Sequence, residues 1–259
     1  MKKLLARPVV ELARRSLMQA ARQPSLLIPS FVFPLILLAI NVSGLDSLTR
    51  LPGFPAVPYL DFAIAFCFMQ GALFAMVNAG TILAGDVQTG FINRLALTPV
   101  HRAALMLGYL TGVLTVYVMA GLVYLGVGLV AGMDVKAGPA GVVVLMGFAL
   151  IIALAFALFG AFAGLRAGNG QAVQALFPLF FVLFFLSSIL LPRDLIQHQW
   201  FRTVATYNPV SYLVEGLRSL IITGWDAEAL ALGLGFALAF TLAGLIAAQA
   251  ALRTRLVRT

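Results

Sequence analysis

Six long runs without a charged residue constrain the fold of this chain more than any other feature. Each run holds between 23 and 31 residues. A transmembrane helix needs about 20 predominantly apolar residues to cross roughly 30 Å of hydrocarbon. The sequence therefore predicts an all-α integral membrane protein with six transmembrane helices in a single domain over residues 1–259. The runs are Gln23–Leu45, Phe62–Gly85, Ala103–Met133, Ala137–Leu165, Ala167–Pro192 and Ala229–Leu252.

The charged residues between the runs predict an orientation. If the N-terminus is cytoplasmic, the cytoplasmic segments hold 12 of the 17 Lys and Arg residues, and the outer segments hold seven of the nine acids. Lysine and arginine are enriched on the cytoplasmic side of membrane proteins. We therefore expect a multi-pass protein of the cell (inner, cytoplasmic) membrane with both termini cytoplasmic. The net charge of +8 follows membrane sidedness, which argues against nucleic acid as a partner.

Residues 2–22 have the pattern of an amphipathic helix lying on the membrane. At 100° per residue the polar side carries Arg7, Glu11, Arg14 and Arg15, and leucine, valine and alanine fall on the other side. Basic residues opposite an apolar face suit the anionic cytoplasmic headgroup layer. Two interpretations stay open, a simple topology anchor and a contact with a cytoplasmic partner.

Two of the connecting segments are longer than a simple turn requires. Residues 86–102 form an amphipathic cytoplasmic segment that starts at Asp86 and reaches Thr98-Pro99, where proline separates it from the third run. The outer segment 193–228 contains Asn208-Pro209, a helix start with an N-cap and a proline at the first helical position.

The helix that starts at Pro209 has two interpretations. In the first it dips into the outer leaflet, and Trp200 and Trp225 lie at the membrane interface. In the second it is an ordinary surface helix, stabilised by an ion pair between Glu215 and Arg218, which are three positions apart.

Several kinds of chemistry are missing from the sequence. There is no G-x-x-x-x-G-K-[ST] loop for a nucleotide, and the one cysteine, Cys67, excludes an intrachain disulfide. None of the six runs carries an ionisable group of the kind that ion-coupled carriers place near the midplane. We therefore expect no metal or cofactor in this chain, and the energy for any uphill transport must come from elsewhere.

An aromatic stripe in the fifth run is the candidate substrate pathway. Such a stripe is also compatible with lipid contact or plain packing, and both alternatives stay open. The pathway residues are Phe177, Phe181 and Phe184, with Phe66 and Gln70 from the second run.

Two motifs resemble those of type-two ABC exporter permeases, and most closely the daunorubicin-resistance type. One is the G-x-x-x-R-L-x-x-T-P-V-x-R run from Gly90 to Arg102, and the other is N-P-V-S-Y-L-V-E-G-L-R from Asn208 to Arg218. The resemblance covers the whole chain. It implies a non-enzymatic permease subunit of an ATP-driven exporter, working with two copies of a separate P-loop ATPase that uses ATP and magnesium, and with a second permease copy.

The resemblance also implies residue roles. The ATPase-coupling element would contain Asp86, Gly90, Arg94, Thr98, Pro99 and Arg102, next to the interfacial helix. The helix with Asn208, Pro209, Glu215 and Arg218 would close the external exit, and the second and fifth spans would face the dimer axis.

The substrate expected from the apolar spans is a hydrophobic or amphipathic small molecule or a lipid. The alternatives are a polysaccharide or glycolipid export permease, a scaffold subunit without transport, and a lipid-modifying membrane enzyme.

Overall fold

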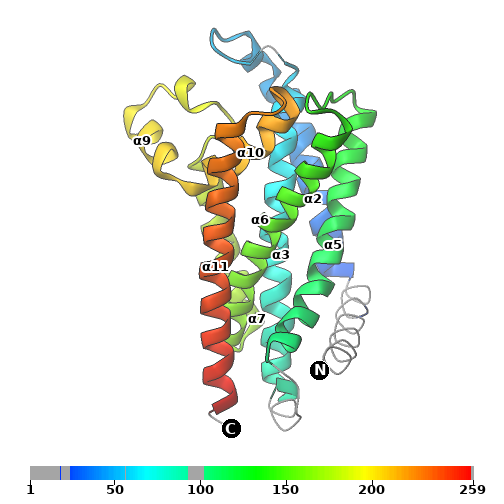
Figure 1. Ribbon diagram of the computed structural model, residues 1–259, viewed down its shortest axis with the longest axis vertical. Helices are drawn as coiled ribbons and strands as arrows, with labels where there is room; N and C mark the ends of the chain where they lie inside the picture. The colour runs from blue at the N-terminus through cyan, green and yellow to red at the C-terminus, as the bar shows by residue number, and fades with distance from the viewer. Residues whose placement is uncertain (1–17, 19–23, 56, 93–101, 258–259) are drawn as a thin grey trace.

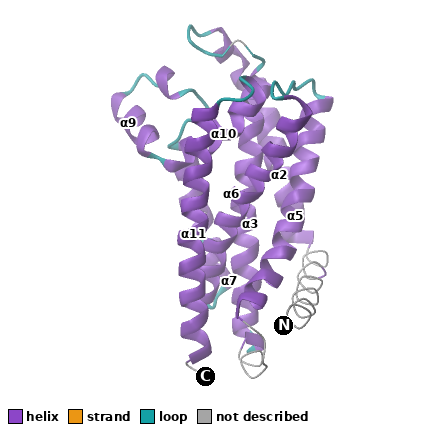
Figure 2. Ribbon diagram, in the orientation of Figure 1, coloured by secondary structure: helices purple, strands orange, loops and turns teal. Residues whose placement is uncertain are grey.

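The computed structural model describes residues 18, 24–55, 57–92 and 102–257, and it consists of helices joined by loops (Figures 1 and 2). No strand occurs in these residues. Within the described residues, five helices are long and apolar enough to cross a membrane. They correspond to five of the six predicted runs and form one elongated bundle. These helices are α2 (Pro24–Leu45), α3 (Tyr59–Gln88), α5 (Arg102–Val130), α6 (Gly138–Ala167) and α11 (Ala227–Val257).

The fifth run, Ala167–Pro192, is not one continuous helix. It forms α7 (Gly170–Gln174) and α8 (Leu176–Phe185), and then leaves the helical conformation before Pro192. Pro178 explains the first break, because it has no N–H to donate to the carbonyl of Gln174, where α7 ends. The prediction of long apolar helices is thus confirmed for five runs, and the fifth run is a broken helix.

Helix α3 lies at the centre of the bundle and contacts α2, α5, α6, α7, α8 and α10. Its closest neighbour is α6, because Gly80, Gly160 and Gly164 bring the two backbones together. A Cβ at Gly160 or Gly164 would overlap the backbone of Met76 or Gly80. The two glycines four positions apart in the fourth run, Gly160 and Gly164, therefore allow α6 to pack closely against α3. Almost all of α3 is buried within the chain, and the orientation of the second and fifth spans toward a dimer axis stays a prediction.

The two ends of the bundle carry different connections (Figure 1). At one end, α11 meets the end of α6, where Arg255 Nε donates to the carbonyl of Leu165 at 2.8 Å. The opposite end carries two short 3-10 helices, η1 (Asp46–Arg50) and η2 (Arg193–Leu195), together with α9 (Gln199–Tyr207) and α10 (Pro209–Ile222). We call the α9–α10 end the external end. The predicted interfacial helix at residues 2–22, with Arg7, Glu11, Arg14 and Arg15, lies outside the described residues.

Candidate functional site

Helix α10 begins where the sequence predicts. The Oδ1 atom of Asn208 accepts a hydrogen bond from the Val210 N–H at 3.0 Å, and Pro209 occupies the first turn. Asparagine satisfies an N–H that the helix itself leaves unpaired, and proline has no N–H to leave unpaired there. The N-P-V motif is therefore a helix start.

Side chains of α10 hold the non-helical end of the fifth run. Asn208 Nδ2 donates to the carbonyls of Leu183 and Leu186 at 2.7 and 3.0 Å. The two terminal nitrogens of Arg218 donate to the carbonyls of Ser188 and Ile189, each at 3.0 Å. Irregular backbone at membrane depth is tolerated only when its polar groups are satisfied by protein or by water in a cavity. One face of α10 thus replaces the hydrogen bonds that α8 gives up when it ends.

Arg218 also links α10 to α3. Its Nε donates to the carbonyl of Phe62 at 3.1 Å, and the guanidinium lies 3.4 Å from the centroid of the Phe62 ring. The side chain is buried, with 6% of the residue exposed. Burial lowers the pKa of Arg218 to about 9, and the charges of Glu215 and Tyr59 act in the opposite direction. The guanidinium therefore remains protonated at neutral pH and holds three backbone carbonyls at once.

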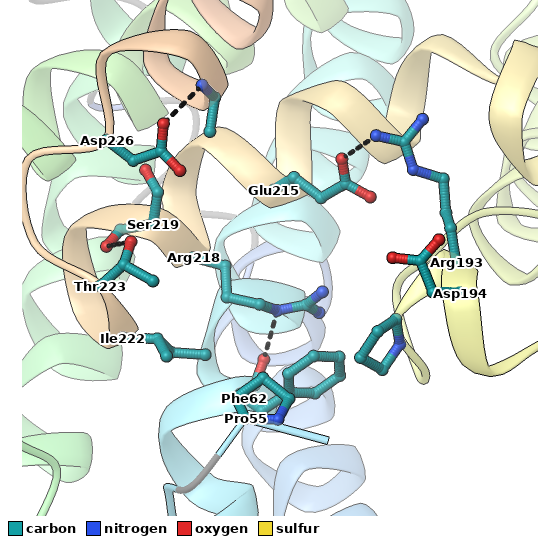
Figure 3. Close-up of a pocket in the computed structure, with 12 residues that line it drawn as sticks. Pro55, Phe62, Arg193, Asp194, Glu215, Arg218, Ser219, Ile222, Thr223 and Asp226 are labelled. Atoms are coloured by element: carbon teal, nitrogen blue, oxygen red, sulfur yellow. Dashed lines mark hydrogen bonds and ion pairs between the residues drawn. The ribbon is translucent and has the colours of Figure 1, made fainter. Parts of the chain in front are cut away.

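The predicted ion pair between Glu215 and Arg218 is wrong. Glu215 instead pairs with Arg193 at 2.5 Å (Figure 3). The Arg193 guanidinium also lies 4.7 Å from the centroid of the Tyr212 ring. Burial lowers the pKa of Arg193, but Glu215 and Tyr212 raise it by more, so the net pKa lies above its usual value. Arg218 instead donates to backbone carbonyls of α3 and the fifth run. Glu215 is therefore free to pair with Arg193 of η2.

A cavity of about 410 Å³ opens between these side chains at the external end (Figure 3). A smaller one of about 160 Å³ adjoins it and shares Arg193, Glu215 and Asp226. The sequence did not identify this cavity, because its walls come from α3, η2, α10 and α11. The charged residues that line the larger cavity are Arg193, Asp194, Glu215, Arg218 and Asp226.

Three of the five predicted pathway residues belong to one aromatic cluster between α3 and α8. Phe66 contacts Phe185 at 6.1 Å between ring centroids, and Phe177 and Phe181 stack at 5.6 Å. Phe181 and Phe185 are 5.0 Å apart, which joins the two pairs. Phe184 points elsewhere and packs against Phe156 of α6 at 5.8 Å. The candidate pathway therefore loses Phe184.

The predicted pathway omitted three members of this cluster, namely Phe185, Phe74 and Phe33. Phe74 contacts Phe177 at 5.3 Å and Phe33 of α2 at 6.1 Å. Helical spacing could have identified Phe74 from the sequence, because Phe74 lies about two turns after Phe66 on the same face of α3.

Gln70 lies one turn from both Phe66 and Phe74 on that face of α3. Only 1% of the residue is exposed, and neither its Nε2 nor its Oε1 has a hydrogen-bond partner within the described part of the chain. A buried amide without partners costs free energy, roughly 1–3 kcal/mol per group. Such a residue calls for an explanation, and a ligand that pairs with the amide is one.

Another cavity of about 310 Å³ lies beside the aromatic cluster, toward the end of α3 away from α10. Its lining is mostly apolar, and two amides, Asn78 and Gln174, provide the polar groups. Phe74 and Phe177 belong to both the cavity and the cluster. The full lining is Pro29, Phe74, Val77, Asn78, Gln174, Phe177 and Pro178.

At the other end of α3, the described part of the predicted coupling element is a fixed turn. Asp86 is buried, and its Oδ2 accepts a hydrogen bond from the Tyr109 hydroxyl of α5. Gly90 has a φ of +69°, which favours glycine at that position. Arg94, Thr98 and Pro99 lie outside the described residues. Arg102 is the first residue of α5, and its side chain is outside the description.

Two comparisons of the sequence with known proteins indicate the family of this chain. The sequence model of the family described as ABC-2 type transporter matches residues 8–222. The daunorubicin resistance ABC transporter permease protein DrrB1 of Streptomyces coeruleorubidus is 29% identical over 208 residues, which cover 77% of this chain and 69% of the relative.

Proposed function

Because the chain belongs to the ABC-2 type transporter family, we propose that it exports a hydrophobic or amphipathic small molecule or lipid, with ATP hydrolysed on a separate subunit. Family membership makes the chain a transmembrane permease subunit of an ABC exporter. The similar protein of Streptomyces coeruleorubidus is named for daunorubicin resistance, which favours a drug-like cargo here.

The observation that carries the substrate proposal is the unpaired amide of Gln70, on the face of α3 that also carries Phe66 and Phe74. Phenylalanine faces offer apolar area, and a buried amide offers one donor and one acceptor site to a ligand with a polar end. The adjoining cavity is mostly apolar. A polysaccharide prefers a polar lining, so an amphipathic cargo that meets Phe66, Gln70, Phe177 and Phe181 is favoured.

Helix α10 is the proposed external gate. Asn208 and Arg218 hold the non-helical end of the fifth run, and Glu215 holds η2 through Arg193. Pro209 fixes where the helix starts. Opening an exit between α8 and α10 requires these bonds to break, so the observed arrangement corresponds to a closed exit.

The composition of the transporter is also part of the proposal. It consists of this chain as a single permease domain over residues 1–259, a second permease copy, and two ATPase subunits that use ATP and magnesium. The protein lies in the inner (cytoplasmic) membrane, and both of its termini face the cytoplasm. The coupling element is the segment from Asp86 to Arg102, together with the interfacial helix. The excess of lysine and arginine in the segments assigned to the cytoplasm supports this orientation.

The test has two steps. The tagged chain is first purified from native membranes in mild detergent, and a P-loop ATPase is expected in one-to-one ratio. A clean oligomer without ATPase, under conditions that preserve other transporter complexes, would instead favour a scaffold subunit.

The reconstituted complex is then assayed for ATPase stimulation by amphipathic drugs and by an undecaprenyl-linked glycan. We expect stimulation by the drugs, and we expect Gln70→Leu to reduce it severalfold. The matched control is Gln171→Leu, because Gln171 is an exposed amide of α7. Stimulation by the glycan alone would overturn the substrate proposal and leave the exporter assignment intact.

A further inference from the structure

Helix α9 exposes an apolar stripe that the proposed transport cycle does not use. Trp200, Val204 and Tyr207 are spaced i, i+4 and i+7, which places them on one face of the helix. Their exposed fractions are 64%, 39% and 83%. The opposite side of α9 faces the protein, with Ala205 fully buried.

The orientation of α9 is fixed by polar contacts on its inner side. Arg202 Nε donates to the carbonyl of Arg193 at 3.2 Å, and its Nη2 donates to the carbonyl of Asp194. The chain then enters α10 through Asn208, which is itself bonded to the end of the fifth run. Because the middle and the C-terminal end of α9 are held in this way, its stripe points away from the bundle.

The level of α9 along the bundle matches a membrane interface. Figure 1 places α9 at the height of α10 and the first turns of α11. A helix of 31 residues such as α11 is about 46 Å long at 1.5 Å per residue, while the hydrocarbon core is roughly 30 Å thick. Helix α11 is therefore long enough to extend beyond the hydrocarbon core. Trp225, which is 59% exposed, lies just before α11.

The composition of the stripe favours contact with lipid at the membrane–water boundary over contact with a second copy of the chain. Tryptophan and tyrosine are enriched at the membrane–water boundary, because their rings are apolar and their N–H and O–H groups remain near water. Exposed polar residues, Gln199 and Thr203, flank the stripe. A stable contact with a second copy needs about 800 Å² per partner, which three side chains on a nine-residue helix do not supply.

We propose that α9 is an interfacial anchor, whose Trp200–Val204–Tyr207 face binds phospholipid at the boundary between headgroups and acyl chains in the external leaflet. Through Arg202 the anchor holds η2, and through the Arg193–Glu215 pair it holds α10. The inference goes beyond the proposed export function and does not depend on the identity of the cargo.

The tryptophan content of the chain allows a direct test, since Trp200 and Trp225 are its only two tryptophans. The full chain with Trp225→Phe reports on Trp200 alone. It is reconstituted in phosphatidylcholine–phosphatidylglycerol nanodiscs whose acyl chains carry bromine either near the headgroup or near the terminal methyl. We expect about twofold or stronger quenching of Trp200 fluorescence by bromine near the headgroup, and less by bromine near the methyl end.

The depth scale comes from a matched variant. Leu242 is 59% exposed in the middle of α11, so Leu242→Trp in a background without Trp200 and Trp225 reports the membrane centre. Its tryptophan should be quenched most by bromine near the methyl end. If Trp200 is quenched by aqueous acrylamide and by neither lipid, the anchor proposal is wrong. Shielding of Trp200 from both lipid and acrylamide would also overturn it, in favour of contact with a second copy.

Discussion

Glu215 forms its ion pair with Arg193, which lies 22 positions earlier in the chain, although Arg218 is only three positions away on the same helix. Arg218 points inward, where the carbonyls at the end of the fifth run lack helical donors. Glu215 points toward η2 at the rim of the external cavity. Two nearby residues of α10 thus have different roles. Arg218 donates hydrogen bonds to buried backbone carbonyls, and Glu215 holds η2 through its ion pair with Arg193.

The Arg193–Glu215 pair should contribute only modestly to stability. Each side chain is 25% exposed, so solvent screens the attraction and the expected coupling energy is about 1 kcal/mol or less. The measurement is a double-mutant cycle with Arg193→Gln and Glu215→Gln, followed by thermal unfolding in detergent. A coupling energy well above 1 kcal/mol would contradict the expected screening of the pair by solvent.

Replacing Arg218 should destabilise the protein more than breaking that ion pair. Arg218→Gln leaves the carbonyls of Phe62, Ser188 and Ile189 without their donors, and each unsatisfied buried group costs roughly 1–3 kcal/mol. Arg218→Lys keeps the charge but not the three-way geometry, so its loss should be intermediate.

The control for Arg218 is Arg50→Gln, at an exposed position of the same external end. The measurement is the melting temperature of the purified variants. Equal effects of Arg218→Gln and Arg50→Gln would contradict the assigned contacts.

Much of the fold follows from the sequence, and the failures have physical causes. Uncharged length identified five helices correctly, because no other regular structure accommodates such runs in a membrane. The same rule overlooked Pro178, which breaks the fifth run. The helical spacing rule paired Glu215 with Arg218, because it ignores acceptors outside the helix. The external cavity stayed hidden, since its residues come from four separate segments.

The close contact of α3 and α6 predicts a strong position dependence for alanine substitution in α6. Gly160→Ala should destabilise the protein by several kcal/mol, because the new methyl overlaps the Met76 backbone, which cannot move away as a flexible side chain can. Gly147→Ala in the same helix meets open space and should be neutral or slightly stabilising. Thermal unfolding in detergent compares the two variants. Similar melting temperatures would exclude the close approach of α3 and α6 at Gly160.

The contact of Asp86 with Tyr109 ties the last turns of α3 to α5. In the sequence these helices directly precede and follow residues 93–101, which belong to the proposed coupling element. The hydrogen bond therefore links the two helices that carry that segment.

Tyr109→Phe removes the hydroxyl and keeps the ring, so we expect a loss of stability of only about 1 kcal/mol. The ratio of drug-stimulated to basal ATPase activity in the reconstituted complex should nevertheless fall severalfold, because the two helices no longer move as a unit. The matched control is Tyr117→Phe, which removes the 3.1 Å hydrogen bond to the Phe68 carbonyl at the middle of the same helix pair. A similar fall in the ratio for both variants would assign the effect to general loosening of α3 and α5. A fall for Tyr109→Phe alone supports coupling through Asp86.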